Sequence, residues 1–94
     1  QHDPNFGDAY YRLGLAYDTL NQSYDAISNL LITEIIYHKA RKMDLFKKTR
    51  ARLELLFTKY QTHRENFKDL HVPETIKGYD LHKRKDQIRT SKEK

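Results

Sequence analysis

The chain has 94 residues, of which 37% are hydrophobic and 33% are charged, and its formal net charge is +5 at pH 7. A chain of this length allows one small domain, which buries only roughly 60–65% of the surface of its unfolded form. The absence of cysteine excludes a disulfide scaffold, a cysteine-ligated zinc finger and a thiol nucleophile.

Apolar residues are scattered rather than gathered into long runs. No run is long enough for a membrane span or a signal peptide, so we expect no membrane partner. Three glycines and two prolines are few for a protein of strands and turns. The chain opens on Gln1 rather than methionine, and we therefore expect a fragment of a larger protein.

The charge is divided unevenly along the chain. Residues 1–36 carry one basic and five acidic side chains, residues 37–62 carry eight basic and two acidic ones, and residues 63–94 carry nine basic and six acidic ones. The net charges of these segments are therefore −4, +6 and +3. An excess of cations in the middle of the chain indicates an anionic partner, or an acidic face elsewhere in a larger protein.

The first predicted helix covers residues 6–20. Asp3-Pro4 is a start signal, with aspartate as the cap and proline in the first turn. Gly14 lies inside the helical pattern, where glycine costs about 1 kcal/mol relative to alanine, so we expect a second helix to approach it closely. The apolar face recurs at steps of three and four residues and comprises Phe6, Ala9, Tyr10, Leu13, Ala16, Tyr17 and Leu20.

The second predicted helix runs from Ser23, a good capping residue, to about Lys42. Asn21-Gln22 forms a short polar break before it. Two helices joined by so short a break must pack antiparallel. The apolar face of this helix comprises Ile27, Leu30, Leu31, Ile35 and His38, with Tyr24 one turn earlier.

A third, longer helix is predicted from a single apolar seam that extends over about 25 residues. Asp44 is its candidate cap, although the pattern also fits one continuous helix through this point. Val72-Pro73 ends it, because the residue before a proline disfavours helix. The seam comprises Phe46, Leu53, Tyr60 and Phe67, spaced by seven, with Leu56, Phe57 and Leu70 beside it.

Apolar content falls from residue 73 onward, where lysine and arginine dominate. We expect a basic, flexible tail that becomes helical only when bound. The predicted organisation is therefore a helical module over residues 1–72 and a tail over 73–94. The predicted fold class is all-α, with an antiparallel helix pair, a long third helix and the basic tail.

The helix pair carries a recognisable order of residues: Tyr10, Leu13-Gly14, Tyr17 and Ala26. This order resembles one tetratricopeptide repeat (TPR), in which aromatic, small and glycine residues lie where two helices touch. Asn21 stands where the family has a turn glycine. The resemblance covers about a third of the chain. It implies a helical scaffold that presents surfaces to partner proteins.

The remainder does not repeat, since no second Leu-Gly pair follows. Four short segments are similar, in their order, to motifs of the 14-3-3-like domain of telomerase-associated and nonsense-mediated-decay proteins (the Est1/SMG family). They are residues 4–7, 10–13, 26–30 and 52–57. Residues 39–44 depart from the usual pattern of that family. This narrower resemblance implies nucleic-acid binding and an intracellular protein of the nucleus, the cytoplasm or both.

A basic stripe, Lys48, Arg52 and Lys59, lies along one line of the predicted third helix, opposite the apolar seam. Arg41 joins the stripe if the second and third helices are continuous. Such a row of cations is typical of a phosphate track for nucleic acid or phosphorylated peptide. The alternative is a solvated face that keeps the protein soluble. Only Glu54 interrupts residues 46–60, so neighbours on the helix cannot neutralise the charge.

A second basic cluster, Lys83, Arg84 and Lys85, lies in the predicted tail. It fits a nuclear-import signal or a nucleic-acid contact. The alternative is an ordinary charged tail, because short basic clusters are frequent in lysine-rich chains.

The tyrosines of the first helix divide into two groups. In a TPR arrangement Tyr10 and Tyr17 are packing residues. Tyr11 and Arg12 point away from that face, and they are therefore better candidates for a peptide-binding groove.

Catalytic and metal-binding patterns are missing from the sequence. The five histidines share no metal-ligand spacing, and the glycines cannot form a phosphate cradle. His38, on an apolar face, is expected to be a packed histidine. We therefore expect no enzyme activity, no metal and no cofactor.

The sequence thus predicts a non-enzymatic helical scaffold or adaptor module that binds other protein subunits through helical packing. The alternative is a nucleic-acid-binding segment that contacts RNA or DNA through the basic helix and tail. A third possibility is an assembly subunit whose long third helix pairs with a helix of another chain.

Overall fold

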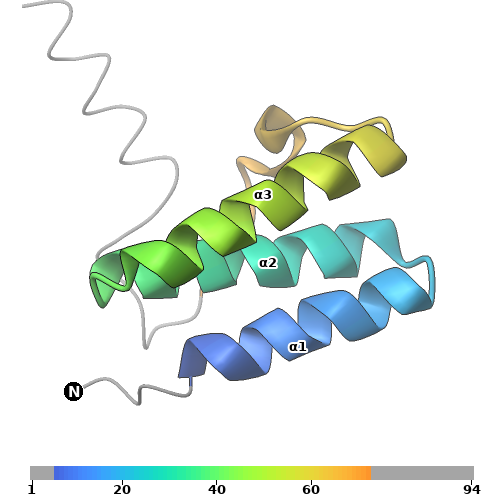
Figure 1. Cartoon of the computed structure of the whole chain (residues 1–94). Helices are drawn as coiled ribbons and strands as arrows, with labels where there is room; N and C mark the ends of the chain where they lie inside the picture. The colour runs from blue at the N-terminus through green and yellow to red at the C-terminus, as the bar shows by residue number, and fades with distance from the viewer. Residues whose placement is uncertain (1–5, 73–94) are drawn as a thin grey trace, which may run out of the picture.

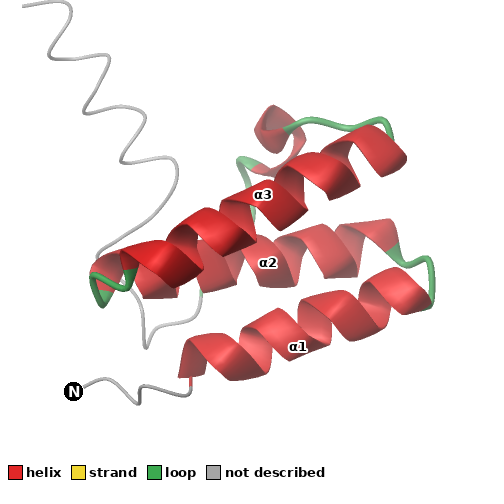
Figure 2. Ribbon diagram, in the orientation of Figure 1, coloured by secondary structure: helices red, strands yellow, loops and turns green. Residues whose placement is uncertain are grey.

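The computed structural model describes residues 6–72 of the chain. Its elements are α1 (Phe6–Thr19), α2 (Ser23–Lys39), α3 (Met43–Lys59) and a short 3-10 turn, η1 (Arg64–Phe67). Each helix runs antiparallel to the one before it (Figure 1). The described part contains helices and loops and no strand (Figure 2). The all-α prediction and the antiparallel helix pair are therefore confirmed. The predicted start signal Asp3-Pro4 and the predicted tail 73–94 lie outside the described residues.

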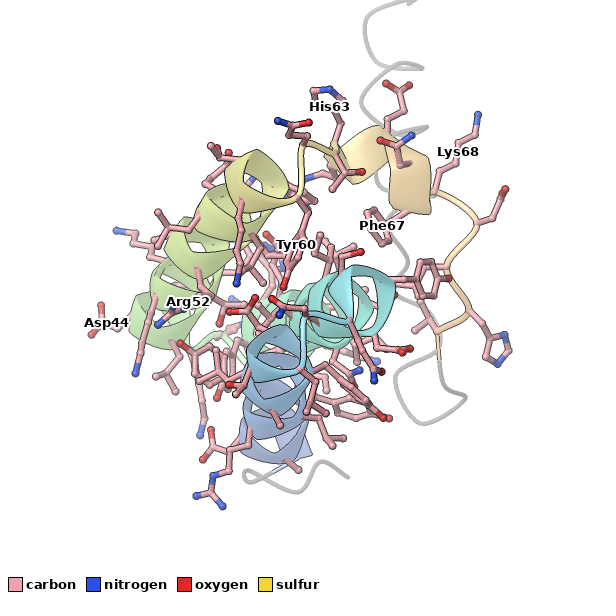
Figure 3. The ribbon with its side chains drawn as sticks, turned by 90° about the vertical axis from the view of Figure 1, so that its right-hand side faces the viewer. Asp44, Arg52, Tyr60, His63, Phe67 and Lys68 are labelled. Atoms are coloured by element: carbon pink, nitrogen blue, oxygen red, sulfur yellow. The ribbon has the colours of Figure 1, made fainter. Side chains whose placement is uncertain are left out.

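Helix α2 is the centre of the molecule, with α1 on one side, α3 on another and η1 on a third (Figure 3). Every residue from 26 to 37 except Asn29 is buried, and eight of these twelve are apolar. Phe67 of η1 packs its ring 5.4 Å from that of Tyr24 and 6.3 Å from that of Phe57. The fully buried side chains of the core include Ile27, Leu30, Leu31, Ile35 and Leu53.

Two glycines set the distance between α1 and α2. A Cβ atom at Gly14 would lie 2.8 Å from the side chain of Leu30, and one at Gly7 would lie 2.7 Å from the ring of Tyr37. Only a residue without a side chain permits this approach. The close packing predicted at Gly14 is confirmed, and Gly7 repeats it seven residues earlier.

The apolar face predicted for α1 is only partly the buried one. Leu13 and Leu20 are 46% and 63% exposed, and Ala9 and Ala16 are also exposed. Tyr10 and Tyr17 pack against the core as expected. Because Gly7 and Gly14 lie closest to α2, the helix is rotated so that Leu13 faces outward, as does Leu20 in the turn after the helix. The expectation that Leu13 packs in the core is wrong.

The third helix is not longer than the second. It ends at Lys59, because Gln61 adopts a positive φ of 53° and the N–H of Thr62 bonds to the carbonyl of Phe57. Phe67 is still buried in the core, but it belongs to η1, which follows a reversal of the chain, and not to the third helix. The predicted seam residues Phe46, Leu53 and Phe67 are thus buried, whereas the single long helix is wrong.

The turns after α1, α2 and α3 share one design and recur every twenty residues. Their central residues, Asn21, Arg41 and Gln61, have φ angles of 60°, 62° and 53°. In each turn the next N–H bonds to the carbonyl five residues before it, at 2.9–3.0 Å. This is the Schellman pattern of a helix C-terminus. A helix pair with its two turns therefore spans forty residues, more than the 34 of a TPR.

The chain enters α2 and α3 directly from these turns. Their N-cap residues are Gln22 and Lys42, and neither makes a side-chain capping bond. Ser23 and Asp44 lie inside the helices, so both capping predictions are wrong. Asp44 instead lies in the first turn of α3, where a negative charge interacts favourably with the helix dipole.

Candidate partner-binding groove

The basic stripe of α3 lies on the flank that faces α1, not opposite the apolar seam as predicted. Lys59 Nζ lies 2.8 Å from Asp18 Oδ1 on α1, and Lys48 Nζ lies 5.4 Å from the ring centre of Tyr11. Arg52 is close enough to Asp18 to lower the pKa of its carboxyl group. The stripe therefore borders a groove between α1 and α3, whose floor is α2.

Asp18 closes one end of this groove. It accepts hydrogen bonds from Lys59 Nζ at 2.8 Å and from the hydroxyl of Tyr60 at 2.6 Å. Tyr60 points from the end of α3 toward α1 (Figure 3). These two bonds, Lys59 first, hold the pKa of Asp18 below its usual value. Lys59 is therefore engaged in holding α3 to α1, which the sequence analysis did not foresee.

A small hollow of about 100 Å³ lies nearer the other end of the groove. Tyr37 donates a hydrogen bond from its hydroxyl to the carboxylate of Asp8 beside it. Burial and this bond raise the pKa of Tyr37 well above its usual range, so its hydroxyl stays protonated. The lining residues are Asp8, Tyr11 and Arg12 of α1, Tyr37 of α2, and Leu45, Lys48 and Thr49 of α3.

Two cations at the hollow remain available for a ligand. Arg12 and Lys48 are exposed, and neither forms an ion pair with another residue in the range 6–72. Asp8 is the only carboxylate in the lining, and it already accepts the hydroxyl of Tyr37. Tyr11 and Arg12 both line the hollow, and their role in a peptide-binding groove stays a prediction. The hollow thus presents a positive rim with an aromatic wall.

The other predicted cations are not part of the groove. Arg41 lies in the exposed turn between α2 and α3, so the continuous helix that would have added it to the stripe is wrong. Lys83, Arg84 and Lys85 lie outside the described residues. Of the predicted site, the structure brings together Lys48, Arg52 and Lys59.

A buried ion pair on the far side of α3 was missed entirely. The carboxylate of Glu34, 1% exposed, accepts two hydrogen bonds from Arg64 at 2.8 and 3.2 Å, and Arg50 Nε lies 3.5 Å away. It ties α2 to both α3 and η1. The signal in the sequence is one carboxylate within the apolar run 30–37, but its partners lie 16 and 30 residues away. Cations of α3 are thus neutralised by distant residues rather than by neighbours.

Residues 6–72 hold no group of three or more side chains suited to a metal ion. None of the described helices is long and apolar enough to cross a membrane. His38 packs its ring 5.1 Å from that of Phe46, as expected for a packed histidine.

Comparisons with protein-family models, with curated proteins and with solved structures gave no match to this chain. The groove must therefore be interpreted from its own residues.

Proposed function

We propose that the chain is a non-enzymatic helical adaptor module of TPR type, which binds an acidic segment of a partner protein in the groove between α1 and α3. The observation that supports this most is the hollow beside Tyr11, with Arg12 and Lys48 on its rim. Both cations come from helices that α2 holds in place, so the rim is preorganised for an anion.

The size of the hollow favours a peptide over a small molecule. Sites for small ligands usually enclose about 300–1,000 Å³, whereas this hollow has about 100 Å³. That volume suits one side chain of an extended segment, such as a glutamate or aspartate. Its carboxylate would accept hydrogen bonds from Lys48 and Arg12, while its methylene groups contact Tyr11.

The alternative function is nucleic-acid binding of the Est1/SMG kind, and it rests on the net charge of +5. One of the α3 cations expected to contact phosphates, Lys59, is engaged with Asp18, and Arg50 of the same helix is engaged with Glu34. This leaves the groove better suited to a few carboxylates than to a long row of phosphates. A location in the nucleus or the cytoplasm, and membership of a larger protein complex, are part of these two proposals and rest on the same observations.

The test compares two charge reversals on the full chain, Lys48→Glu and Lys47→Glu. Both residues are exposed on α3 and both changes alter the net charge equally, but only Lys48 lines the hollow. We expect Lys48→Glu to weaken binding of a fluorescent oligo-glutamate peptide at least about fivefold, because like charges are then juxtaposed. Lys47→Glu should change it less than about twofold by the same reasoning.

A single-stranded RNA probe of matched length gives the competing outcome. Nucleic-acid binding through the basic stripe predicts that Lys48→Glu also weakens binding of the RNA, and that this binding has a log–log salt slope of about −0.7 per phosphate contacted. Equal loss of peptide affinity in the two variants, or tighter binding of RNA than of peptide at physiological salt, would overturn the groove proposal. Lys59 is left unchanged in this design, because its reversal would place two carboxylates together at Asp18.

A further inference from the structure

The segment 63–72, which we call the strap, covers the third side of α2 and contacts the body of the molecule, residues 6–59 (Figure 3). Arg64 donates two hydrogen bonds to the buried carboxylate of Glu34, at 2.8 and 3.2 Å. Phe67 is buried and stacks on the ring of Tyr24. The remaining apolar contacts join Leu70 and Val72 to Ile32, Ile35 and Ile36. The strap thus has a complete and specific set of contacts of its own.

A three-residue hinge, residues 60–62, joins the strap to α3. Gln61 adopts a positive φ of 53° there, which strains a residue that has a side chain. No glycine or proline occurs between residues 43 and 72, and the sevenfold apolar spacing from Phe46 to Phe67 continues through the hinge. The sequence of the hinge is therefore as compatible with helix as with a turn, and straightening it relieves the strain.

A straight hinge has one clear consequence for the strap. It carries residues 63–72 away from their own α2 and uncovers apolar surface on both parts. The strap of a second copy fits the vacated surface, because it brings the same arginine, phenylalanine and apolar residues to the same positions. Reciprocal exchange therefore preserves every strap contact, and short hinges under strain favour it. What opposes it is the loss of freedom when two chains associate.

We propose that this chain forms a dimer in which two copies exchange their straps. The ion pair of Arg64 with Glu34 and the stack of Phe67 on Tyr24 then form between the copies. Because association opposes the exchange, the share of dimer rises with protein concentration. All residues that line the hollow precede the hinge, so the groove between α1 and α3 is retained and each dimer presents two of them.

The first test compares glycine substitutions in two turns of the same design. Gln61 and Arg41 have φ angles of 53° and 62°, but only the turn at Gln61 must straighten for the exchange. Glycine accepts a positive φ without strain and disfavours helix, so Gln61→Gly favours the closed monomer twice over. It should raise the dissociation constant of the dimer at least about tenfold, since each dimer contains two hinges. Arg41→Gly should leave this constant within about twofold.

Sedimentation equilibrium of the full chain measures these constants. Each sample is refolded from urea at its final concentration, because exchange requires the strap to leave its site. Concentrations between about 10 µM and 1 mM cover the range of weak association. Circular dichroism of each variant checks that the helices are retained.

The second test identifies the exchanged segment. Isotope-labelled and unlabelled chains are unfolded together in equal amounts and refolded at the highest concentration. An isotope-filtered nuclear Overhauser experiment then detects only contacts between a labelled and an unlabelled copy. We expect a signal between the rings of Phe67 and Tyr24, whose centres lie 5.4 Å apart. The rings of His38 and Phe46, 5.1 Å apart within the body, are the matched control and should give none.

Three results would overturn the proposal. One is a monomer at every concentration, which would show that the strap stays on its own α2. Another is a dimer without the signal between Phe67 and Tyr24, which would place the contact between copies elsewhere. The third is an equal effect of Gln61→Gly and Arg41→Gly on the dissociation constant, which would show that the hinge at residues 60–62 does not control the exchange.

Discussion

Helices α1 and α2 lie against each other along their length, yet they are held in opposite ways. Eleven residues of α2 are buried, and they fill the core with side chains. In α1 the buried residues among those with described side chains are Gly7 and Gly14, which contribute almost no side chain at all. Near its two ends, α1 is instead held by Asp8 and Asp18, each of which accepts a tyrosine hydroxyl from a neighbouring part of the chain.

The difference shows that a leucine can contribute much to stability in one helix and little in the helix beside it. Leu30 and Leu31 of α2 are fully buried, whereas Leu13 of α1 is 46% exposed. The stability of α1 depends on close backbone approach and on two polar contacts. Four changes separate these two modes of attachment.

The largest effect is expected from Leu30, which is fully buried in α2. Leu30→Ala should lower the free energy of unfolding by about 2–5 kcal/mol, because it leaves a cavity at the centre of the core. Leu13→Ala, the same change on α1, should cost less than about 0.5 kcal/mol, as for most surface substitutions. Urea denaturation at low protein concentration measures both. Equal losses would show that α1 buries its leucines after all.

The next effect concerns the glycine contact. Gly14→Leu should destabilise the protein by about 1–3 kcal/mol, because the new side chain collides with Leu30 and with the carbonyl of Ala26. Ala16→Leu adds a larger side chain two residues away, at an exposed position, and should change stability by less than about 0.5 kcal/mol. If both variants unfold at the same temperature, close approach is not what positions α1.

A pH effect is expected from Asp18. Its pKa is lowered from 3.8 in the folded protein, so the unfolded chain binds the proton more tightly. The resulting stability is present above pH 3.8 and is lost as the pH falls through the lowered pKa. Asp18→Asn should flatten this acid limb in thermal melts, whereas Asp69→Asn, at an exposed position after η1, should preserve it. An unchanged limb in Asp18→Asn would show that this contact is absent in solution.

The smallest effect is an increase in stability. Arg41 and Gln61 have positive φ angles, which cost residues with a side chain about 1–2 kcal/mol. Replacing either with glycine relieves this strain but gives the unfolded chain more freedom, so we expect a net gain of about 0.5–1 kcal/mol. Arg52→Gly, in the middle of α3, should instead be destabilising by about 1 kcal/mol. Midpoints of urea unfolding distinguish the signs.

Local pattern was sufficient for part of this structure. The periodicity of apolar residues indicated three helices, and the conflict between Gly14 and helix propensity indicated a close helix. The outward rotation of α1 was not predictable in this way, because Tyr10, Leu13 and Tyr17 form an equally good apolar face. What decides between the faces is the fit of Gly7 and Gly14 against Leu30 and Tyr37, which only the packed pair reveals.

The residues of the candidate groove likewise include some that the sequence predicted and some that it did not. Tyr11 and Arg12 were identified because they lie off the packing face of a helix pair. The role of Lys59 was not, since Asp18 is 41 residues away and helix spacing reports only on neighbours. The ion pairs of Glu34 with Arg50 and Arg64 were not predicted for the same reason.

The three turns have a consequence for how the sequence can change. Each is closed by two backbone hydrogen bonds, and the helices that follow Asn21 and Arg41 begin without a side-chain cap. No particular side chain is therefore needed at residues 20–22 or 40–42 for the chain to reverse. These ends of the bundle can drift in sequence, or accept inserted loops, while the helices between them stay in register.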